Sequence, residues 1–339
     1  MFPIKELAGK RVDVLSKGGV YRPADFKSYG NQPLMEVEFS DGRKVYATPE
    51  HKWYVKNCSN KEVTITTTQL KKRHRIKRTL AARPEKNEEY REGVRHGFIF
   101  GDGNRAGNRS TAMFYGAKDA ALRPFFEGYG NAPRPRLDRH DTVMISGFPI
   151  AYKELPDADK SASYWYGFVS GFMAADGTVD IYGCAMLTQI KRETLEAIEA
   201  QLPRLGMCSG PIRAQRRVTN PGLSLGRDCE YDSTIHFMTL LKRFMNEDDL
   251  LIAAHKEKFI NNKSTSDKYG EYVAVKSVKM TDRREEVFCC EEKETSSFVI
   301  DNGIITSNCY GNAFIRLHLP FDRVLVDHRN GKYKEYAVS

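Results

Sequence analysis

Two aspartates occupy matching places in two similar segments, residues 95–103 and 166–177. Asp102 and Asp176 each follow an apolar run and precede a glycine. Small residues recur every four positions before each aspartate and so share one face of a helix: Gly93, Gly97 and Gly101 before the first, and Gly167, Gly171 and Ala175 before the second. Such faces let two backbones approach closely. The pattern predicts two helices packed side by side, each ending at one aspartate, with Gly103 and Gly177 in left-handed terminating turns.

The predicted position of these carboxylates is electrostatically unfavourable. A carboxylate at a helix C-terminus faces the negative end of the helix dipole, and two neighbouring carboxylates repel each other. A divalent cation would relieve both effects, and oxygen ligands suit Mg²⁺, which keeps several waters and also binds phosphate oxygens. We therefore predict an Mg²⁺ site at Asp102 and Asp176 for phosphodiester hydrolysis. The alternative, two core helices that happen to end in Asp-Gly, is favoured for either segment alone and disfavoured by the two together.

The similarity between the two segments continues beyond them. The aspartates lie 74 positions apart, and other positions repeat at an offset of 73: Ala112-Met113 with Ala185-Met186, Lys118 with Lys191, and Leu122 with Leu195. A constant offset indicates duplicated units, each made of a helix, then strands, then a helix.

The paired segments resemble the two motif helices of LAGLIDADG homing endonucleases. Residue by residue, the resemblance implies that Asp102 and Asp176 bind the catalytic metal, that the partner is double-stranded DNA, and that two saddle-shaped four-stranded sheets straddle it. Lys153, in Lys153-Glu154-Leu155-Pro156, resembles a family signature, and a lysine at this place can assist the hydrolytic water. A solvated charge is the favoured alternative for Lys153.

Thr48 and His51 lie three positions apart beyond an Asp-Gly turn between alternating runs, which predicts a β-hairpin. A threonine hydroxyl and an imidazole at a strand end can face one peptide bond, the first binding its amide and the second protonating its leaving nitrogen. In isolation, a turn with a surface histidine is the favoured alternative. The Thr-x-x-His pattern nevertheless resembles intein and hedgehog-type autoprocessing domains, called Hint domains, as do residues 4–12 and 42–55.

Residues 304–309 resemble an intein C-terminal junction. The resemblance implies that Asn308 is the last intein residue, whose side chain cyclises and breaks the bond to Cys309, the first residue of the host protein. Ser307 and Ser296 stand where inteins usually carry histidines that assist this step, so slow cleavage is expected. Cys289 falls where the family commonly has aspartate or cysteine, and both proton handling and simple packing of a thiol remain open for it.

The start of the chain also departs from the family. Inteins open with a cysteine or serine nucleophile, whereas this chain opens at Met1-Phe2-Pro3-Ile4, already inside the first β segment. We expect an incomplete reading frame or a misplaced start, and a separately encoded N-terminal intein fragment is the less favoured explanation. Without that nucleophile, peptide cleavage without ligation is expected.

The composition restricts the class of protein. The 339 residues carry a formal net charge of +9, with a pI near 9.0, which fits a nucleic-acid partner. Seven cysteines without regular pairs or close metal spacing argue against a disulfide framework and a zinc site, and favour a reducing compartment. No signal peptide or apolar run of membrane-spanning length is found. We expect a monomer that contacts no membrane and acts in the cytoplasm, that of a host cell if it is viral or phage-encoded.

Together these patterns predict an α+β multidomain chain, in which a mostly-β Hint (intein) domain is interrupted by a duplicated α/β LAGLIDADG endonuclease. We assign residues 1–83 and 263–308 to the two parts of the Hint domain, 84–262 to the endonuclease and 309–339 to a host-protein fragment. The expected activities are site-specific double-strand DNA cleavage and autocatalytic cleavage between Asn308 and Cys309. The alternative is a LAGLIDADG protein that binds nucleic acid without cutting it, either a decayed endonuclease or an RNA-splicing maturase.

Overall fold

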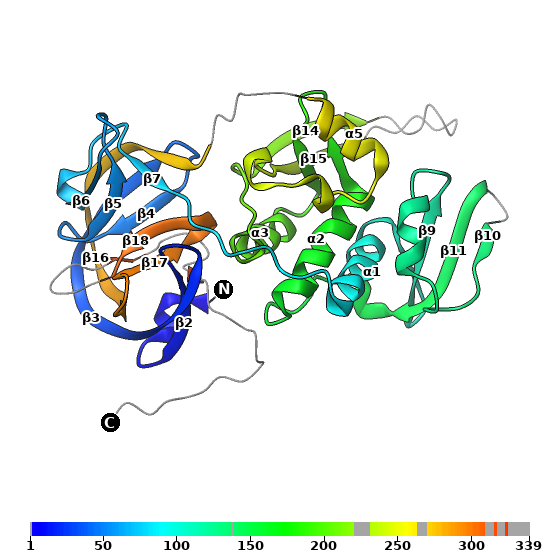
Figure 1. Cartoon of the computed structure of the whole chain (residues 1–339), viewed down its shortest axis with the longest axis horizontal. Helices are drawn as coiled ribbons and strands as arrows, with labels where there is room; N and C mark the ends of the chain where they lie inside the picture. The colour runs from blue at the N-terminus through cyan, green and yellow to red at the C-terminus, as the bar shows by residue number, and fades with distance from the viewer. Residues whose placement is uncertain are drawn as a thin grey trace. The chain divides into compact units, whose positions relative to one another are not determined.

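The computed structural model describes residues 2–136, 139–219, 231–262, 270–308, 315–316 and 323–324. Two compact units divide the chain, unit 1 with residues 1–83, 200–208 and 268–339, and unit 2 with residues 84–199 and 209–267 (Figure 1). Unit 1 is thus built from segments on both sides of unit 2 in the sequence. It also takes in residues 200–208, because the Ala81 N–H donates to the Pro203 carbonyl at 2.9 Å and Arg83 Nη1 donates to the Leu205 carbonyl at 2.7 Å.

Unit 1 consists mainly of antiparallel strands. Its strands are β1 (Phe2–Pro3), β2 (Arg11–Ser16), β3 (Val20–Phe39), β4 (Lys44–Ala47), β5 (Lys52–Lys56), β6 (Glu62–Thr66), β7 (Arg75–Lys77), β16 (Tyr272–Glu292), β17 (Ser297–Ile300), β18 (Ile304–Ser307), β19 (Ile315–Arg316) and β20 (Arg323–Val324). Short 3₁₀ turns are η1 (Ile4–Leu7), η2 (Thr67–Gln69), η5 (Leu202–Leu205) and η8 (Asp301–Gly303). One sheet has the strand order β2-β3-β4-β19-β16-β7-β5-β6, with a further β3–β16 pairing, and the other has the order β1-β20-β17-β18.

The two longest strands of unit 1, β3 and β16, come from opposite ends of the chain and pair antiparallel over much of their length (Figure 1). Alternating residues of β3 enter the core, where Phe26, Val37 and Phe39 are at most 1% exposed. The predicted Asp-Gly hairpin is confirmed, since β3 pairs with β4 across a turn in which Gly42 has φ +86°. That positive φ is the conformation for which glycine is suited.

A buried ion cluster joins three segments of unit 1. The Asp41 carboxylate lies 2.7 Å from Arg78 Nη2 and 2.5 Å from Arg43 Nη1, and Arg43 Nε lies 3.1 Å from Asp301 Oδ2. Arg78 also donates to the Asn302 carbonyl at 2.8 Å. Burial raises the pKa of Asp41, but the two arginines outweigh burial and leave that pKa below its usual value. The cluster holds the η8 turn, which precedes β18, against the end of β7.

Unit 2 contains two similar halves of helices and strands. The helices are α1 (Glu88–Asp102), α2 (Ala162–Asp176), α3 (Arg192–Gln201), which runs into unit 1, and α5 (Ala253–Asn261). The strands are β8 (Asn104–Ala106), β9 (Arg109–Tyr115), β10 (Arg134–Arg136), β11 (Arg139–Pro149), β12 (Gly177–Val179), β13 (Ala185–Gln189), β14 (Arg213–Thr219) and β15 (Tyr231–Thr239). The 3₁₀ turns are η3 (Ala120–Phe125), η4 (Ile150–Lys153), η6 (Lys242–Phe244) and η7 (Glu247–Asp249).

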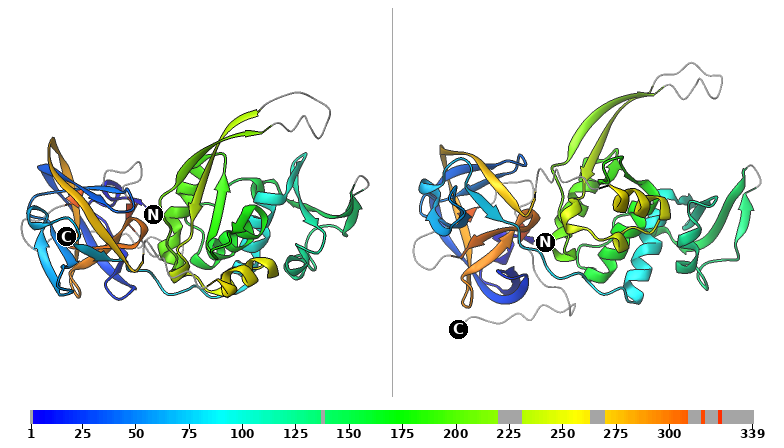
Figure 2. Two further views of the ribbon diagram at one scale, coloured as in Figure 1. Left: turned by 90° about the horizontal axis from the view of Figure 1, so that it is seen from above. Right: turned by 45° about the horizontal axis from the view of Figure 1, so that its top comes forward.

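The strands of unit 2 form two four-stranded antiparallel sheets, in the orders β8-β9-β11-β10 and β12-β13-β15-β14. In each half the first strand pairs with the second, the second with the fourth, and the fourth with the third. The predicted duplication and the two four-stranded sheets are therefore confirmed. The β14–β15 pair extends well beyond the other strands of its sheet (Figure 2).

Helices α1 and α2 pack through their glycines. A Cβ atom at Gly97 would overlap the Phe168 carbonyl oxygen, and one at Gly171 would overlap the Val94 carbonyl oxygen. Further along, a Cβ at Gly101 would come within 2.5 Å of the Ala175 Cβ. The contact is therefore made by the two main chains, as the four-residue rhythm predicts.

The prediction of left-handed turns after the two helices is wrong. Gly103 has φ −94° and ψ 163°, and Gly177 has φ −85° and ψ 162°, so both lead directly into strands. Space explains the glycines instead, because a Cβ at Gly103 would overlap the Ile99 carbonyl oxygen and one at Gly177 would overlap that of Met173. The chain passes over the last turn of each helix too closely for a side chain.

Replacing Gly97 by alanine should destabilise unit 2. The added methyl group meets a helix backbone that cannot move independently, so the cost should be about 3 kcal/mol or more. Thermal unfolding of Gly97→Ala should show the loss, while Glu257→Ala, at an exposed position of α5 in the same unit, should unfold close to wild type. Equal unfolding temperatures for wild type and Gly97→Ala would contradict this packing.

Among the helices that the structure describes, none is both long enough and apolar enough to cross a membrane.

Candidate functional site

The two aspartates of unit 2 lie close together at the ends of α1 and α2. A Cβ at Gly101, the neighbour of Asp102, would stand 3.2 Å from Asp176 Oδ2. Two residues that the sequence did not single out as site residues also reach this place. Lys118 Nζ lies 3.7 Å from Asp102 Oδ2, and Gln189 Nε2 donates to Asp176 Oδ2 at 3.1 Å. The repeat contained a signal for the lysine, because Lys118 is one of the positions that recur.

Both carboxyl groups are held in an environment that disfavours their charge. Burial raises the pKa of Asp102 to about 6; Lys118 opposes this effect and the Asp176 carboxylate adds to it. Burial also raises the pKa of Asp176, against the lowering effects of Lys153 and Lys118. Raised carboxyl pKa values of this kind are typical of functional sites. A cation bound nearby would favour the charged form of both groups.

The residues present fit a hard divalent cation. Asp102 Oδ2 is buried and has no hydrogen-bond partner among the described residues. Those residues include no cluster of three or more histidine, cysteine, aspartate or glutamate side chains that could hold a metal ion, so protein ligation would come from the two carboxylates. Mg²⁺ commonly binds through one or two carboxylates, with waters and phosphate oxygens completing its shell.

Lys153 occupies a place that sequence reasoning did not anticipate. Its Nζ donates to the carbonyls of Ile99, Phe100 and Gly103, at 2.9, 2.6 and 2.8 Å. The expectation of a solvated lysine is wrong, because the side chain is half-buried and neutralises the carbonyl end of α1. Burial lowers the pKa of Lys153. The ammonium therefore orients the helix end that carries Asp102.

In unit 1, Thr48 and His51 form a tight turn between β4 and β5. The His51 N–H donates to the Thr48 carbonyl at 3.1 Å, and His51 Nε2 lies 2.5 Å from Thr306 Oγ1 on β18. The alternative of a surface histidine is wrong, since His51 is fully buried against Trp53. The turn and the C-terminal strand are thereby brought together. His51 Nδ1 has no hydrogen-bond partner among the described residues.

Burial lowers the pKa of His51 to about 3. The imidazole is therefore neutral near pH 7, and in this state one ring nitrogen carries a proton that it can donate while the other can only accept. Protonation of a leaving nitrogen by His51, as predicted, would need a change in its surroundings that raises this pKa.

The buried imidazole makes the stability of unit 1 depend on pH. Between pH 6.5 and 3 the unfolded chain takes up a proton at His51 that the folded chain does not. The free energy of unfolding should therefore decrease by roughly 1.4 kcal/mol for each unit by which the pH is lowered in this range. Trp53 fluorescence should follow urea unfolding of unit 1 in a Trp165→Phe background, since the chain has two tryptophans. His51→Gln should lose this part of the pH dependence; an unchanged slope would contradict the assignment.

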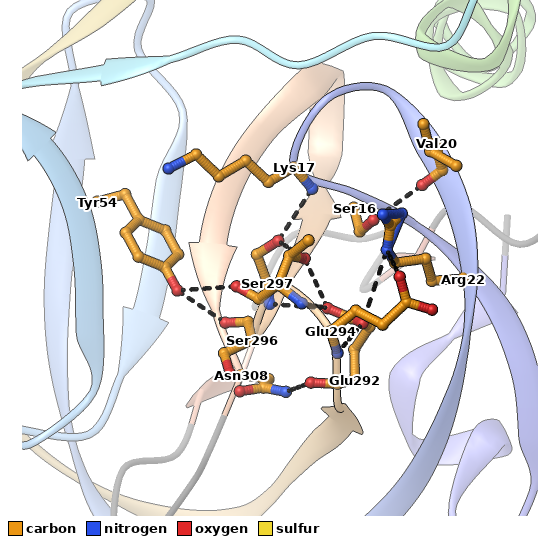
Figure 3. Close-up of polar contacts among 11 residues, drawn as sticks. Ser16, Lys17, Val20, Arg22, Tyr54, Glu292, Glu294, Ser296, Ser297 and Asn308 are labelled. Atoms are coloured by element: carbon orange, nitrogen blue, oxygen red, sulfur yellow. Dashed lines mark hydrogen bonds and ion pairs between the residues drawn. The ribbon is translucent and has the colours of Figure 1, made fainter.

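Asn308 is buried at the end of β18, and three of its polar atoms are held. Its Nδ2 donates to the Glu292 carbonyl (Figure 3). Its N–H donates to the Ser296 carbonyl at 2.8 Å, and its own carbonyl accepts from Ser307 Oγ at 2.9 Å. The Ser307 hydroxyl is thus directed at the carbonyl of the Asn308–Cys309 peptide bond. Ser296 itself has φ +52° and contributes its main chain.

The remaining predicted site residues lie elsewhere or outside the described residues. Cys289, on β16, is buried and donates its Sγ hydrogen to the Cys290 carbonyl at 3.6 Å, which agrees with a packed thiol and leaves its role in proton handling untested. Cys309 lies outside the described residues. Sequence reasoning also missed Tyr54, whose hydroxyl donates to the Ser296 carbonyl at 2.9 Å.

Comparisons with known proteins connect these observations to families. A family model described as the intein splicing domain matches residues 8–308. No curated protein matches the chain. Similar solved structures include full-length WhiA from Thermatoga maritima, at 11% identity, 52% coverage of this chain, 57% of that chain and a TM-score of 0.32. Variants of the homing endonuclease I-DmoI give 12% identity, 52% and 96% coverage and a TM-score of 0.29.

Proposed function

Because the chain belongs to the intein splicing domain family, we propose that it is a splicing element whose unit 2 cuts duplex DNA and whose unit 1 cleaves the peptide bond after Asn308. The DNA-cutting assignment depends above all on the pairing of Asp102 and Asp176 at the ends of two helices locked together by glycines. The duplication of the sheets supports an asymmetric target with one half-site for each repeat. Exposed arginines on edge strands, among them Arg134 and Arg213, suit contacts to DNA phosphates.

The two carboxylates would hold Mg²⁺, which when bound supplies charge neutralisation at the phosphate and an activated water. The side chains of the protein set the conditions for this chemistry. Asp102 and Asp176 provide the negative charge, Gln189 orients the second carboxylate, and Lys153 holds the end of the helix that carries the first. Lys118, half-exposed beside Asp102, is placed to bind a substrate oxygen.

Chelation should separate cutting from binding. Incubation with host-gene DNA that lacks the insert should yield a double-strand break in Mg²⁺ and none in excess EDTA, while a gel shift persists in both. Binding should weaken steeply as salt rises, because contacts to phosphates release counterions. Cleavage in EDTA would contradict the metal assignment. Binding without cleavage at any divalent ion would favour the alternative of a decayed endonuclease or maturase.

Cleavage after Asn308 is proposed as an intramolecular cyclisation. Asn308 Nδ2 attacks the carbonyl carbon of its own residue, the bond to the Cys309 nitrogen breaks, and a C-terminal succinimide forms. The proton lost from Nδ2 is balanced by the proton gained by the Cys309 amine. Ser307 Oγ, which donates to the Asn308 carbonyl oxygen at 2.9 Å, is placed to stabilise negative charge on that oxygen. Mass spectrometry of the purified chain at neutral pH tests the proposal, and a free 309–339 peptide is expected.

A further inference from the structure

The main chain around residues 292–297 is shaped by one buried carboxylate. Glu292 is fully buried, and its Oε1 accepts from the Glu294 N–H at 2.7 Å. Its Oε2 accepts from the Thr295 N–H at 2.9 Å, from Thr295 Oγ1 at 2.6 Å and from the Ser297 N–H at 3.4 Å. A charged side chain is costly to bury unless it is satisfied in this way. Both oxygens are used to close a tight turn between β16 and β17.

The carbonyls of this turn hold Asn308. The Glu292 carbonyl accepts from Asn308 Nδ2, the atom that attacks, and the Ser296 carbonyl accepts from the Asn308 N–H. Figure 3 shows the contact between Asn308 Nδ2 and the Glu292 carbonyl, together with the Tyr54 hydroxyl that donates to the Ser296 carbonyl. The left-handed φ of +52° at Ser296 is unusual for a residue with a side chain, and the hydrogen bonds of Glu292 stabilise it.

The turn is also fixed on its other side. Ser297 Oγ accepts from the Lys17 N–H at 2.9 Å and shares a hydrogen bond of 2.7 Å with Thr295 Oγ1. Arg22 Nε lies 2.8 Å from Glu294 Oε2 and 4.0 Å from Glu292 Oε1. The β2–β3 hairpin therefore braces the segment that carries the Asn308 contacts, through Lys17 in its turn and Arg22 on β3.

We propose that Glu292 is a positioning residue for the reaction at Asn308: its buried carboxylate shapes the turn whose carbonyls hold the attacking amide and the main chain of that residue. This inference rests on the proposed cleavage after Asn308. It identifies a glutamate, which never touches the reacting atoms with its side chain, as the group that keeps the nucleophile beside the carbonyl. Positioning of this kind matters because a displacement of about 1 Å in a reacting group can cost roughly a hundredfold in rate.

Glu292→Gln tests the proposal with almost no change in shape. An amide offers one acceptor and one donor, so it cannot accept on both sides of the turn, and the N–H groups of Glu294 and Thr295 cannot both be satisfied. Release of the 309–339 peptide, followed by mass spectrometry, should slow by roughly tenfold to a hundredfold. The matched control is Glu291→Gln, next in sequence, whose carboxylate binds Lys27 instead; it should release the peptide at the wild-type rate.

A spectroscopic readout distinguishes positioning from general stability. With ¹⁵N-asparagine labelling, the side-chain amide of Asn308 should show slow hydrogen exchange in wild type and in Glu291→Gln, and faster exchange in Glu292→Gln at a temperature where all three are folded. If Glu292→Gln does not fold, Thr295→Val, which removes one hydroxyl donor to the carboxylate, should give the same two changes to a smaller extent.

The possible outcomes distinguish a failure of the role of Glu292 from a failure of the proposed cleavage after Asn308. A folded Glu292→Gln, or Thr295→Val where that variant is used, with wild-type release and unchanged exchange at Asn308 would overturn the role of Glu292. A wild-type chain that releases no peptide contradicts the proposed cleavage, and the exchange measurement then still decides whether Glu292 holds the Asn308 amide.

Discussion

Asp102→Asn and Asp176→Asn should each abolish double-strand DNA cleavage while leaving DNA binding largely intact. Asparagine keeps the shape of aspartate and removes the negative charge that a divalent cation needs, so the loss should be at least about a hundredfold. Binding should persist because the proposed contacts between the sheets and DNA phosphates involve neither residue. A supercoiled plasmid that carries the target, analysed together with a gel shift, measures both properties.

Asp102→Asn should not lower the thermal stability of the folded chain. Because the pKa of Asp102 is raised to about 6, its charge destabilises the folded chain near pH 7, and Asp102→Asn should unfold at or above the wild-type temperature. Glu127→Gln, an exposed carboxylate of the same unit, is the control and should cut normally. If either aspartate variant cut both strands at the wild-type rate, the metal site would lie elsewhere.

Asn308→Ala should stop release of the 309–339 peptide altogether. The nucleophile of the proposed cyclisation is the side-chain amide, and removing a nucleophile typically lowers a rate by at least about a thousandfold. Asn308→Gln should also fail to release the peptide, because its longer side chain cannot form the five-membered succinimide ring. Asn31→Ala, exposed on β3 of the same unit, is the control for an asparagine that has no part in the reaction.

Two results of this experiment distinguish cyclisation from hydrolysis by another route. Release by wild type and by Asn31→Ala alone supports cyclisation. Release by Asn308→Ala as well would show hydrolysis by another route, such as contaminating protease. Ser307→Ala should slow release by roughly a hundredfold or more, because a hydrogen bond to the developing oxyanion is lost. An unchanged rate would show that Ser307 does not stabilise the oxyanion.

The parts of the structure that repeat or alternate could be predicted from the sequence. The four-residue glycine rhythm predicted the contact between α1 and α2, and the 73-residue offset predicted the duplicated units, whereas the two four-stranded sheets were implied only by the resemblance to LAGLIDADG endonucleases. These features follow from local periodicity, which one sequence displays directly. The Asp41-Gly42 turn was predicted for the same reason, because its chemistry is confined to adjacent residues.

The parts that depend on distant contacts could not be predicted. The sequence favoured a solvated charge for Lys153. Its three carbonyl partners become apparent only when η4 is placed against the end of α1. The sequence predicted left-handed turns at Gly103 and Gly177. It does not distinguish a glycine that adopts a positive φ from one that is required because a side chain would not fit. The burial of His51 depends on β18, more than 250 positions away.

The interleaving of β16 between strands of the first segment has a kinetic consequence during synthesis. β3 and β7 both require β16 as a neighbour, yet about 190 residues must be translated between Lys77 and Tyr272. At typical rates of elongation this takes about 10 to 40 s, during which the long edge of β3 has no partner. An unpaired edge is a template for aggregation, so nascent chains should depend on chaperones during this interval, and slower translation should reduce the yield of folded protein.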